Sequence, residues 1–240
     1  MDLIESQQLG PEQACSHWYY RSKFKLLEKS LASVLRNHPS PKLADFGCGD
    51  GIFLKLIERS GLMSAEQMTG IDSGYARAQQ SGEIRMLPEF PPGGKFDVIL
   101  MMDVLEHVED EQAVLAEVLK HLNSGGTLFI TVPALPILWS RHDEILLHYR
   151  RYTLSSLKSL LSAFQELKIF RLHYYYGLLL PVAAPLRFFK RHSTETQTDL
   201  QPAPALLNLL LVALFELELH VARWNRLAGL SAVAVCRLEK

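Results

Sequence analysis

The feature that most constrains the fold is a short apolar segment followed at once by a glycine-rich turn. Residues 42–46 have the character of a short β-strand, Gly47-Cys-Gly-Asp-Gly51 follows directly, and residues 52–59 resume helical spacing. A strand, a glycine turn and a helix in this order open a βαβ unit. Glycines permit positive φ, and without Cβ atoms the backbone amides at the helix start can approach a carboxylate or phosphate. The sequence therefore predicts an α/β fold, with a plain strand-to-helix turn as the alternative to a binding site.

Strand and helix patterns continue to alternate along the chain. Short apolar runs predict further strands at 67–71, 84–87, 96–101, 127–132, 167–172 and 231–238. Helical spacing predicts helices at 12–36, 75–80, 109–122 and 153–164. Strands that alternate with helices imply one doubly wound, mostly parallel sheet, with 12–36 as an N-terminal helix ahead of it. We expect the 240 residues to form one domain, 1–240.

Composition and charge exclude several classes of protein. The chain is 48% hydrophobic, and its 25 Lys and Arg against 26 Asp and Glu leave no surplus positive charge for nucleic-acid binding. Residues 1–10 contain no apolar run, and Asn208 and Glu216 interrupt the longest apolar stretch, which argues against a signal peptide and a spanning helix. The cysteines form no CxxC pair, which excludes a disulfide framework and a zinc knuckle. We expect a cytoplasmic protein, soluble or peripheral to the inner face of the membrane.

Two acidic residues lie where a ligand at the glycine turn would meet them. Asp72 ends the second predicted strand, from which a carboxylate can accept both hydroxyls of a ribose. Asp45 comes two residues before Gly47, where a dinucleotide-binding strand is normally apolar. The spacing is GxGxG rather than GxGxxG, since position 52 is Ile. A nicotinamide-dependent oxidoreductase is therefore disfavoured.

These motifs together resemble the class I S-adenosylmethionine-dependent methyltransferases. Residues 44–51 are similar to the glycine motif of that family, Asp72 to its acid after the second strand, and residues 96–107 to its fourth-strand motif. The resemblance covers at least residues 12–172 and is to a bacterial type 11/12-like subgroup, with a more distant similarity to ubiquinone-type O-methyltransferases. It implies a seven-stranded sheet whose last strand, 231–238, is antiparallel, and S-adenosylmethionine as the cofactor.

The resemblance also implies roles for particular residues. The backbone at Gly47 and Gly49 would approach the methionine part of the cofactor, and Asp72 would hold its ribose. Met102 and Asp103 would lie beside its amino-acid end. The full set of cofactor-binding residues expected on this basis is Trp18, Arg21, Asp45, Gly47, Gly49, Asp72, Met102 and Asp103.

An aromatic cluster precedes the first strand. His17-Trp-Tyr-Tyr-Arg21 resembles the HWWFR-type opening of some bacterial methyltransferases. By this resemblance the segment would lie across the cofactor as a lid, with Trp18 against it and Arg21 making a forked contact to its carboxylate. The alternative is an ordinary amphipathic helix that packs on the sheet.

An acidic and histidine-bearing segment follows the fourth strand. Asp103, Glu106 and His107 resemble the E-x-x-E-H metal site of ubiquinone-type O-methyltransferases and of small-RNA 2′-O-methyltransferases, with Asp in place of the first Glu. Carboxylate oxygens suit Mg²⁺, which would polarise an acceptor hydroxyl. We favour the alternative that Glu106 and His107 cap or orient the next helix, and we expect no metal.

A dense polar loop follows the fifth strand, on the acceptor side of the cleft in this fold. Residues 139–144 and 148–153 resemble the WS-x-HDE…H-x-RRY run of the same bacterial subgroup. Either histidine can take a hydroxyl proton, because imidazole titrates near neutral pH, an aspartate can orient it, and an arginine, Arg150 or Arg151, can hold an anionic acceptor group. The alternative is a structural polar network. The catalytic candidates are His142, Asp143, His148, Arg150 and Tyr152.

Residues 174–230 form an insertion before the last strand. Two apolar stretches, 178–189 with a basic end and 205–219, surround a polar linker at 191–199. Such surfaces need a cover: the protein's own core, a second subunit of a homodimer, a lipid-like acceptor or a membrane surface. We hypothesise that the insertion roofs the acceptor cleft and favours a hydrophobic substrate.

The sequence thus predicts a methyltransferase that acts on a small, hydrophobic molecule of phenolic, polyene or lipid-like character, more readily at oxygen than at carbon or nitrogen. One rival is a C-methyltransferase that acts on an aromatic or polyketide-type acceptor. Another is a non-catalytic module that binds the cofactor or a membrane.

Overall fold

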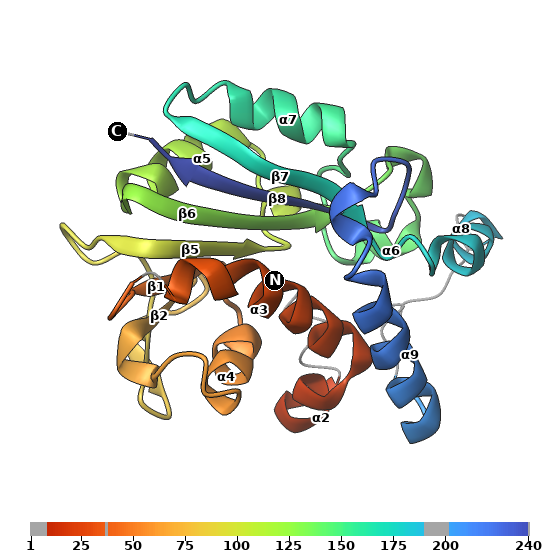
Figure 1. The fold of residues 1–240 in the computed structure, drawn as a ribbon, viewed down its shortest axis with the longest axis horizontal. Coiled ribbons are helices and arrows are strands. Elements are labelled where there is room, and N and C mark those ends of the chain that lie inside the picture. Colours follow the sequence, from red (N-terminus) through yellow and green to blue (C-terminus); the bar gives the residue numbers. More distant parts are fainter. Residues whose placement is uncertain (1–8, 37, 190–201, 240) are drawn as a thin grey trace.

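The computed structural model describes residues 9–36, 38–189 and 202–239 (Figure 1), and the predicted polar linker at 191–199 lies outside them. The strands are β1 (Leu43–Phe46), β2 (Met68–Ile71), β3 (Gln79–Ser81), β4 (Ile84–Leu87), β5 (Phe96–Met102), β6 (Leu122–Pro133), β7 (Leu167–Tyr175) and β8 (Ser231–Leu238). The α-helices are α2 (Pro11–Ser16), α3 (Trp18–Arg36), α4 (Ile52–Arg59), α5 (Glu111–Lys120), α6 (Arg141–Ile145), α7 (Leu154–Ser162), α8 (Leu180–Phe189) and α9 (Ala205–Glu218). Short 3₁₀ turns are η1 (Ala65–Gln67), η2 (Leu105–His107), η3 (Pro136–Leu138) and η5 (Ala222–Trp224).

The strand order confirms a doubly wound, mostly parallel sheet. The order is β3-β4-β2-β1-β5-β6-β8-β7. β4, β2, β1, β5 and β6 run parallel to one another, and β8 is antiparallel to both β6 and β7, as predicted for the last strand. The carboxyl ends of the parallel strands therefore meet at one edge of the sheet, on the side of α6 in Figure 1. In open α/β sheets this edge is where ligands bind.

The sheet has eight strands rather than the predicted seven, because a short β3 pairs antiparallel with β4 at the edge. β3 overlaps residues 75–80, for which a helix was predicted, and that prediction was wrong. A turn follows β2 instead: the Asp72 carbonyl accepts the Tyr75 N–H, and Asp72 Oδ1 accepts the Gly74 N–H at 2.9 Å. Gly82, with φ 63°, then turns the chain from β3 into β4.

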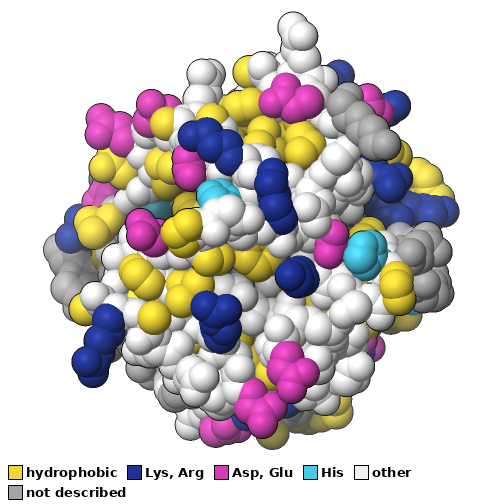
Figure 2. All heavy atoms as spheres, turned by 90° about the vertical axis from the view of Figure 1, so that its left-hand side faces the viewer, with side chains coloured by type: hydrophobic (Ala, Val, Ile, Leu, Met, Phe, Trp, Pro, Cys, Tyr) yellow, Lys and Arg dark blue, Asp and Glu magenta, His cyan; other side chains and the backbone are white. Residues whose placement is uncertain are grey.

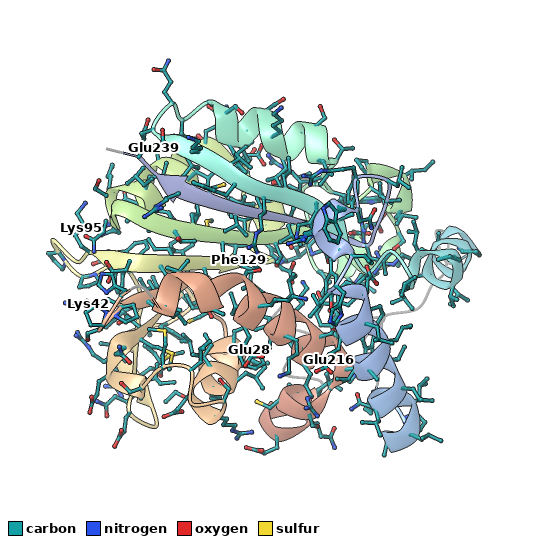
Figure 3. All side chains as sticks on the ribbon, viewed as in Figure 1. Glu28, Lys42, Lys95, Phe129, Glu216 and Glu239 are labelled. Carbon is teal, nitrogen blue, oxygen red and sulfur yellow. The ribbon has the colours of Figure 1, made fainter. Side chains whose placement is uncertain are left out.

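Helices cover both faces of the sheet. On one face, Leu27 of α3 and Ile52 of α4 belong to the same buried cluster as Phe129 of β6, which Figure 3 labels near the middle of the sheet. On the other face, Leu115 of α5 and Leu157 of α7 pack in a second buried cluster. These two clusters explain why the strands between them are apolar on both sides.

The N-terminal helix predicted at 12–36 is broken at His17, whose φ and ψ of −67° and 136° are extended. Asn208 of α9 bridges the break. Its Oδ1 accepts the Trp18 N–H at 2.6 Å, and its Nδ2 donates to the Ser16 carbonyl at 2.9 Å. The hydrophobic pattern of residues 12–36 could not predict this break, because Asn208, which pairs with the exposed backbone groups, is about 190 residues away in the sequence.

The insertion is helical, as predicted, and it packs on the N-terminal helix. β7 continues to Tyr175, beyond the predicted end at Leu172, before α8 begins. The buried Glu218 at the end of α9 accepts the Gly177 N–H at 2.8 Å and the Leu178 N–H at 3.3 Å, which ties α9 to the start of the insertion. Over the described residues, no helix is both long enough and apolar enough to cross a bilayer.

The end of the molecule at which the parallel strands begin has mixed charge. Lys42 and Lys95, which precede β1 and β5, mark this end in Figure 3. Figure 2 views it directly and shows acidic and basic side chains interspersed over it. Among the described residues of this face, charges of both signs lie side by side.

Candidate active site

The glycine turn after β1 has the backbone that the sequence predicted. Gly47, Gly49 and Gly51 have φ of 71°, 54° and 71°, a left-handed conformation that residues with side chains rarely adopt. A Cβ atom at Gly47 would lie 2.6 Å from Cγ2 of Val104 in the loop after β5. Position 47 therefore requires glycine, as does a turn whose backbone amides contact a bound cofactor.

Asp72 and the glycine turn meet directly. Parallel pairing places Phe46 beside Ile71, so β1 and β2 end side by side. Asp72 Oδ2 accepts the Gly49 N–H at 2.8 Å, and the Tyr75 hydroxyl donates to the Gly49 carbonyl. This geometry supports the prediction that the acid and the glycines serve one site.

A cleft of about 750 Å³ opens beside this turn. Its walls include Gly47, Asp72, Glu89, Val104 and His107, which come from the loops after β1, β2, β4 and β5. The volume lies within the range of roughly 300–1,000 Å³ that small-molecule sites occupy. The cleft is therefore large enough for the cofactor that the glycine motif implies.

One wall of the cleft is aromatic, which the sequence did not reveal. The Phe90 ring stacks on Phe46 at 5.5 Å and on His121 at 4.1 Å between ring centroids. All three residues line the cleft. A flat aromatic wall suits a planar heterocycle such as a purine. No sequence signal could have joined these rings, because they come from β1, the loop after β4 and the end of α5.

Asp45 is buried beneath the glycine turn. It is 1% exposed, and within the described residues neither of its carboxylate oxygens has a hydrogen-bond partner. Burial raises the pKa of Asp45 to about 7, and the negative charge of Asp72 acts in the same direction. A nearby cation would favour the ionised form of this acid, and the expected cofactor, S-adenosylmethionine, carries an ammonium and a sulfonium group.

We expect cofactor affinity to weaken as the pH falls below about 7. A cationic cofactor favours the ionised Asp45, so at lower pH a proton must leave the carboxyl, which weakens binding by up to about tenfold per pH unit. Above the pKa the affinity should be constant. The stability of the cofactor-free protein should change with pH in the opposite direction. Folded Asp45 retains a proton that the unfolded chain releases above about pH 4, so the free energy of unfolding falls as the pH rises toward 7.

Calorimetric titration with S-adenosylmethionine between about pH 5.5 and 8.5 measures this dependence. Asp45→Asn should flatten the profile, since an amide does not titrate. A wild-type affinity that stays constant across the range would show that Asp45 does not sense the cofactor.

The N-terminal helix α3 reaches the end of β5. Asp103 follows β5 with φ 53° and is buried. Its Oδ1 accepts the Thr131 hydroxyl at 3.1 Å, and its Oδ2 accepts the Tyr19 hydroxyl at 3.2 Å and the Lys23 ammonium. Lys23 is fully buried and lies 4.6 Å from the centroid of the Tyr19 ring. Helix α3 thus places a buried ion pair at the predicted amino-acid end of the cofactor.

The structure shows the surroundings of three residues predicted to contact the cofactor at this end, and those contacts stay predictions. Arg21 is exposed, and the buried cation is Lys23. Trp18 stacks on Phe215 of α9, with 5.5 Å between ring centroids, rather than across the cleft. Met102 is 1% exposed and packs in the core. Positions 21 and 23 differ by about 200° around a helix, and only tertiary packing decides which of them faces inward.

The loop after β6 folds back onto the end of β5 and forms a buried polar group. The Tyr149 N–H donates to the Glu106 carbonyl at 2.7 Å. Asp143 Oδ1 lies 3.0 Å from His148 Nδ1 and 2.7 Å from Arg151 Nε. Burial raises the pKa of Asp143, but the hydrogen bond from His148 and the charge of Arg151 outweigh it and hold the pKa below its usual range. Asp143 is therefore a carboxylate, and His148 donates to it through Nδ1.

This arrangement distinguishes between the two candidate histidines. His148 is oriented by Asp143, which leaves Nε2 as the nitrogen that carries the lone pair in the neutral ring. His142 lies half-buried on α6, directly before Asp143 in the chain. The Asp143–His148 pair has the geometry of an oriented base, in which the carboxylate fixes the ring and its tautomer.

Two other catalytic candidates in this loop, Arg150 and Tyr152, contact Glu109 and Glu111 rather than the Asp143–His148 pair. Arg150 donates to the Glu109 carbonyl at 2.8 Å and pairs with Glu111 at 3.1 Å. The Tyr152 hydroxyl donates to Glu111, and burial followed by that hydrogen bond raises the pKa of Tyr152 far above its usual value. Arg151 also donates to the Ala134 carbonyl at 3.0 Å. Arg150 and Tyr152 hold the loop against α5, as the structural alternative expects, and their catalytic role stays a prediction.

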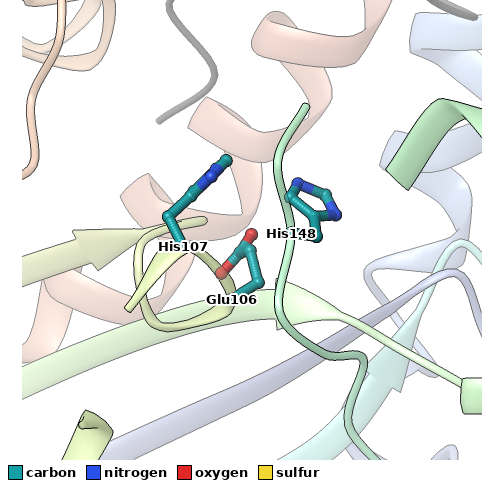
Figure 4. Close-up of side chains that lie close together, drawn as sticks. All are labelled: Glu106, His107 and His148. Carbon is teal, nitrogen blue, oxygen red and sulfur yellow. The ribbon is translucent and has the colours of Figure 1, made fainter. Parts of the chain in front are cut away.

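We expected no metal, and among the described residues the candidates Asp103, Glu106 and His107 do not form one cluster, although Glu106 and His107 belong to a different one. Asp103 is bound by Lys23, whose ammonium would repel a cation. Glu106, His107 and His148 instead offer ligand atoms within 4.8 Å of one another (Figure 4). One carboxylate and two imidazoles suit a divalent transition metal better than Mg²⁺, which prefers oxygen ligands. Because His148 Nδ1 faces Asp143, such an ion would take Nε2 and would block proton acceptance there.

Known protein families agree with this site. A family model described as a methyltransferase domain matches residues 17–170, which include the glycine turn, Asp72 and the loop after β6. The match spans more than half of the 240 residues, so the chain belongs to the methyltransferase domain family. It is a class I methyltransferase that uses S-adenosylmethionine.

Two curated relatives resemble part of the chain. The mitochondrial ubiquinone biosynthesis O-methyltransferase of Candida albicans is 30% identical over 108 residues, which are 40% of this chain and 33% of that protein. The tRNA U34 carboxymethyltransferase of Campylobacter hominis is 32% identical over 130 residues, which are 48% and 42% of the two chains. This chain therefore spans less than half the length of either relative.

Solved structures share the fold at low sequence identity. The plantazolicin methyltransferase BpumL, bound to a monoazolic desmethyl analogue and SAH, gives a TM-score of 0.58 at 14% identity and covers 98% of this chain and 89% of its own. The [4+2]-cyclase SpnF gives 0.51 at 18% identity, covering 90% and 80%. The same fold thus serves more than one reaction, and the acceptor must be argued from the site.

Proposed function

We propose that this methyltransferase methylates a hydroxyl oxygen of a small, apolar acceptor of phenolic or lipid-like character, with His148 as the base. The observation that carries the proposal is the buried Asp143–His148 pair, 3.0 Å apart, in the loop beside the cofactor cleft. Two ubiquinone biosynthesis O-methyltransferases among the relatives support attack by oxygen.

The chain's own residues have few tasks in such a reaction. When bound, the cofactor supplies a methyl group that its sulfonium already activates. The glycine turn and Asp72 would hold the cofactor, and the ion pair of Lys23 with Asp103 would lie near its amino-acid end. The rate then depends on alignment and on exclusion of water, and a base matters because a hydroxyl must lose its proton. His148 Nε2 would take that proton while Asp143 stabilises the imidazolium.

Apolar character of the acceptor is argued from the elements around this loop. α8 contacts η3, and the charge of Arg187 on α8 acts on both Asp143 and Arg151. The side chains that α8 and its preceding turn expose nearby are largely aliphatic: Leu178, Val182 and Leu186. An acceptor that approaches from this side would meet an apolar surface, with Arg187 as its one described cation.

Replacing His148 tests the proposal. With catechols that carry or lack an alkyl chain as acceptors, His148→Ala should lower kcat by about 10²–10⁴-fold, because the hydroxyl loses its base. Binding of S-adenosylhomocysteine should be unchanged. His142→Gln, the matched control on the same loop, should alter kcat by less than about threefold.

The position of the transferred methyl group decides between this proposal and its rivals. NMR of the product should show an O-methyl resonance, and the alkylated acceptors should have the lower KM. A methyl group on carbon would favour the C-methyltransferase alternative. Turnover by His148→Ala at the wild-type rate would rule out the proposed base.

A further inference from the structure

Helix α9 presents an apolar face to solvent. The buried side of the helix packs against α3 and holds Val212 and Phe215. The opposite side and the segment after it expose a row of large apolar residues, each between 58% and 70% exposed. We call this row the apolar face, and it consists of Leu206, Leu209, Leu210, Leu217, Val221 and Trp224.

The apolar face is held firmly in this orientation. Asn208, from the inner side of α9, makes hydrogen bonds to backbone groups on both sides of the break at His17. Trp18 stacks on Phe215, and Glu218 at the far end of α9 accepts two backbone N–H groups at the start of the insertion. These polar contacts are made by the inner side, so rotation of the apolar face into the core would break them.

The charges beside the apolar face are positive. Arg223 and Arg226 are exposed, and the Arg223 guanidinium lies 3.9 Å from the centroid of the Trp224 ring. Of the two acids in α9, Glu218 is buried in its backbone contacts, and Glu216 is half-buried at the edge of the helix (Figure 3). Leucines, a tryptophan and flanking arginines complement a membrane surface with anionic head groups.

Apolar side chains are also exposed near the loop after β6, which holds His148. α8 and α9 lie at the same end of the molecule, to the right in Figure 1. η3, which α8 contacts, exposes Ile137, and Leu147 is exposed directly before His148. Exposed apolar side chains therefore lie both on α9 and beside the loop that holds His148, at the same end of the molecule.

We propose that the apolar face docks on the surface of an anionic lipid bilayer, with α9 lying in the interface and Arg223 and Arg226 at the level of the head groups. Docking itself follows from the exposed residues and their flanking charges. Only its purpose, delivery of an apolar acceptor, rests on the proposed function. Binding to vesicles needs no methyl transfer, so the two proposals can fail separately.

Vesicle flotation with the full chain tests the docking. The wild-type protein should float with vesicles of phosphatidylglycerol and phosphatidylcholine, and less with phosphatidylcholine alone. The triple variant L206E/L210E/L217E should bind at least about tenfold more weakly, because charged side chains oppose burial in the interface. Arg223→Gln with Arg226→Gln should weaken binding to the anionic vesicles by several-fold per arginine, and this loss should disappear at high salt.

A matched control separates docking from general effects of added charge. Gln79 and Gln80 are exposed on the edge strand β3, outside the apolar face, and Q79E/Q80E should bind vesicles as the wild type does. Circular dichroism and SAH binding report whether each variant is folded. Failure of the folded wild type to float with anionic vesicles would overturn the proposal. So would sedimentation showing that the apolar face joins two copies of the chain, with L206E/L210E/L217E converting a dimer to a monomer.

Discussion

Replacing Lys23 by methionine should lower the free energy of unfolding by about 3–5 kcal/mol, because it leaves the buried Asp103 carboxylate without its counter-charge. The Lys23 side chain is fully buried. The other two side chains that donate to Asp103, those of Tyr19 and Thr131, are neutral hydroxyls. Chemical denaturation monitored by circular dichroism measures the loss.

Two further variants make this prediction specific. Lys25 lies two residues after Lys23 in the same helix and forms a partly exposed ion pair with Glu28. Lys25→Met removes this pair and should lower the free energy of unfolding by less than about 1 kcal/mol. In the double variant K23M/D103N the uncompensated charge is gone, and asparagine tolerates the left-handed φ of position 103, so most of the lost stability should return. Equal losses for Lys23→Met and Lys25→Met would show that the ion pair is not what stabilises this end of the site.

Replacing Gly47 by alanine should weaken cofactor binding by at least about tenfold. Two effects add: a φ of 71° strains any residue with a side chain by roughly 1–2 kcal/mol, and the new Cβ would lie 2.6 Å from Val104. The loop after β5 would have to move away from the glycine turn, and that loop lines the same cleft. Calorimetric titration with S-adenosylhomocysteine measures the change.

Gly82 provides the matched control. It also has a positive φ, 63°, but a Cβ there would meet nothing within 4 Å, and it lies between β3 and β4 away from the cleft. Gly82→Ala should therefore share the loss of stability but keep the affinity for the cofactor. Val104→Ala combined with Gly47→Ala should recover part of the binding. If Gly47→Ala and Gly82→Ala bound the cofactor equally well, the close approach at Gly47 would have no role in binding.

Features that depend on adjacent residues were predictable from the sequence. The strand, the glycine turn and the following helix form a contiguous motif, and Asp72 is placed by the same strand periodicity. The fold class followed from alternation along the chain, and only the short edge strand β3 was mistaken for a helix. In that segment Asp72 and Gly82 impose turns, and turn chemistry outweighed the weak helical spacing.

Features that depend on distant contacts were not predictable. Arg21 and Lys23 are both cations in one helix, and the choice between them is made by Asp103, which is 80 positions away from Lys23. One signal did exist: Lys23 shares a helical face with Leu27 and Leu31, and a cation in an apolar row requires a buried partner. Similarly, His148 and His142 are indistinguishable in sequence until the fold brings Asp143 against one of them.

The central claim is that the glycine turn after β1 and Asp72 together hold S-adenosylmethionine, and calorimetry with its product S-adenosylhomocysteine tests it most directly. We expect the folded wild-type chain to bind one equivalent with a dissociation constant of about 1–100 μM. Asp72→Asn, which retains the shape of the side chain but loses its charge, should bind at least about tenfold more weakly. Absence of heat with folded wild-type protein, or an unchanged affinity in Asp72→Asn, would contradict the account.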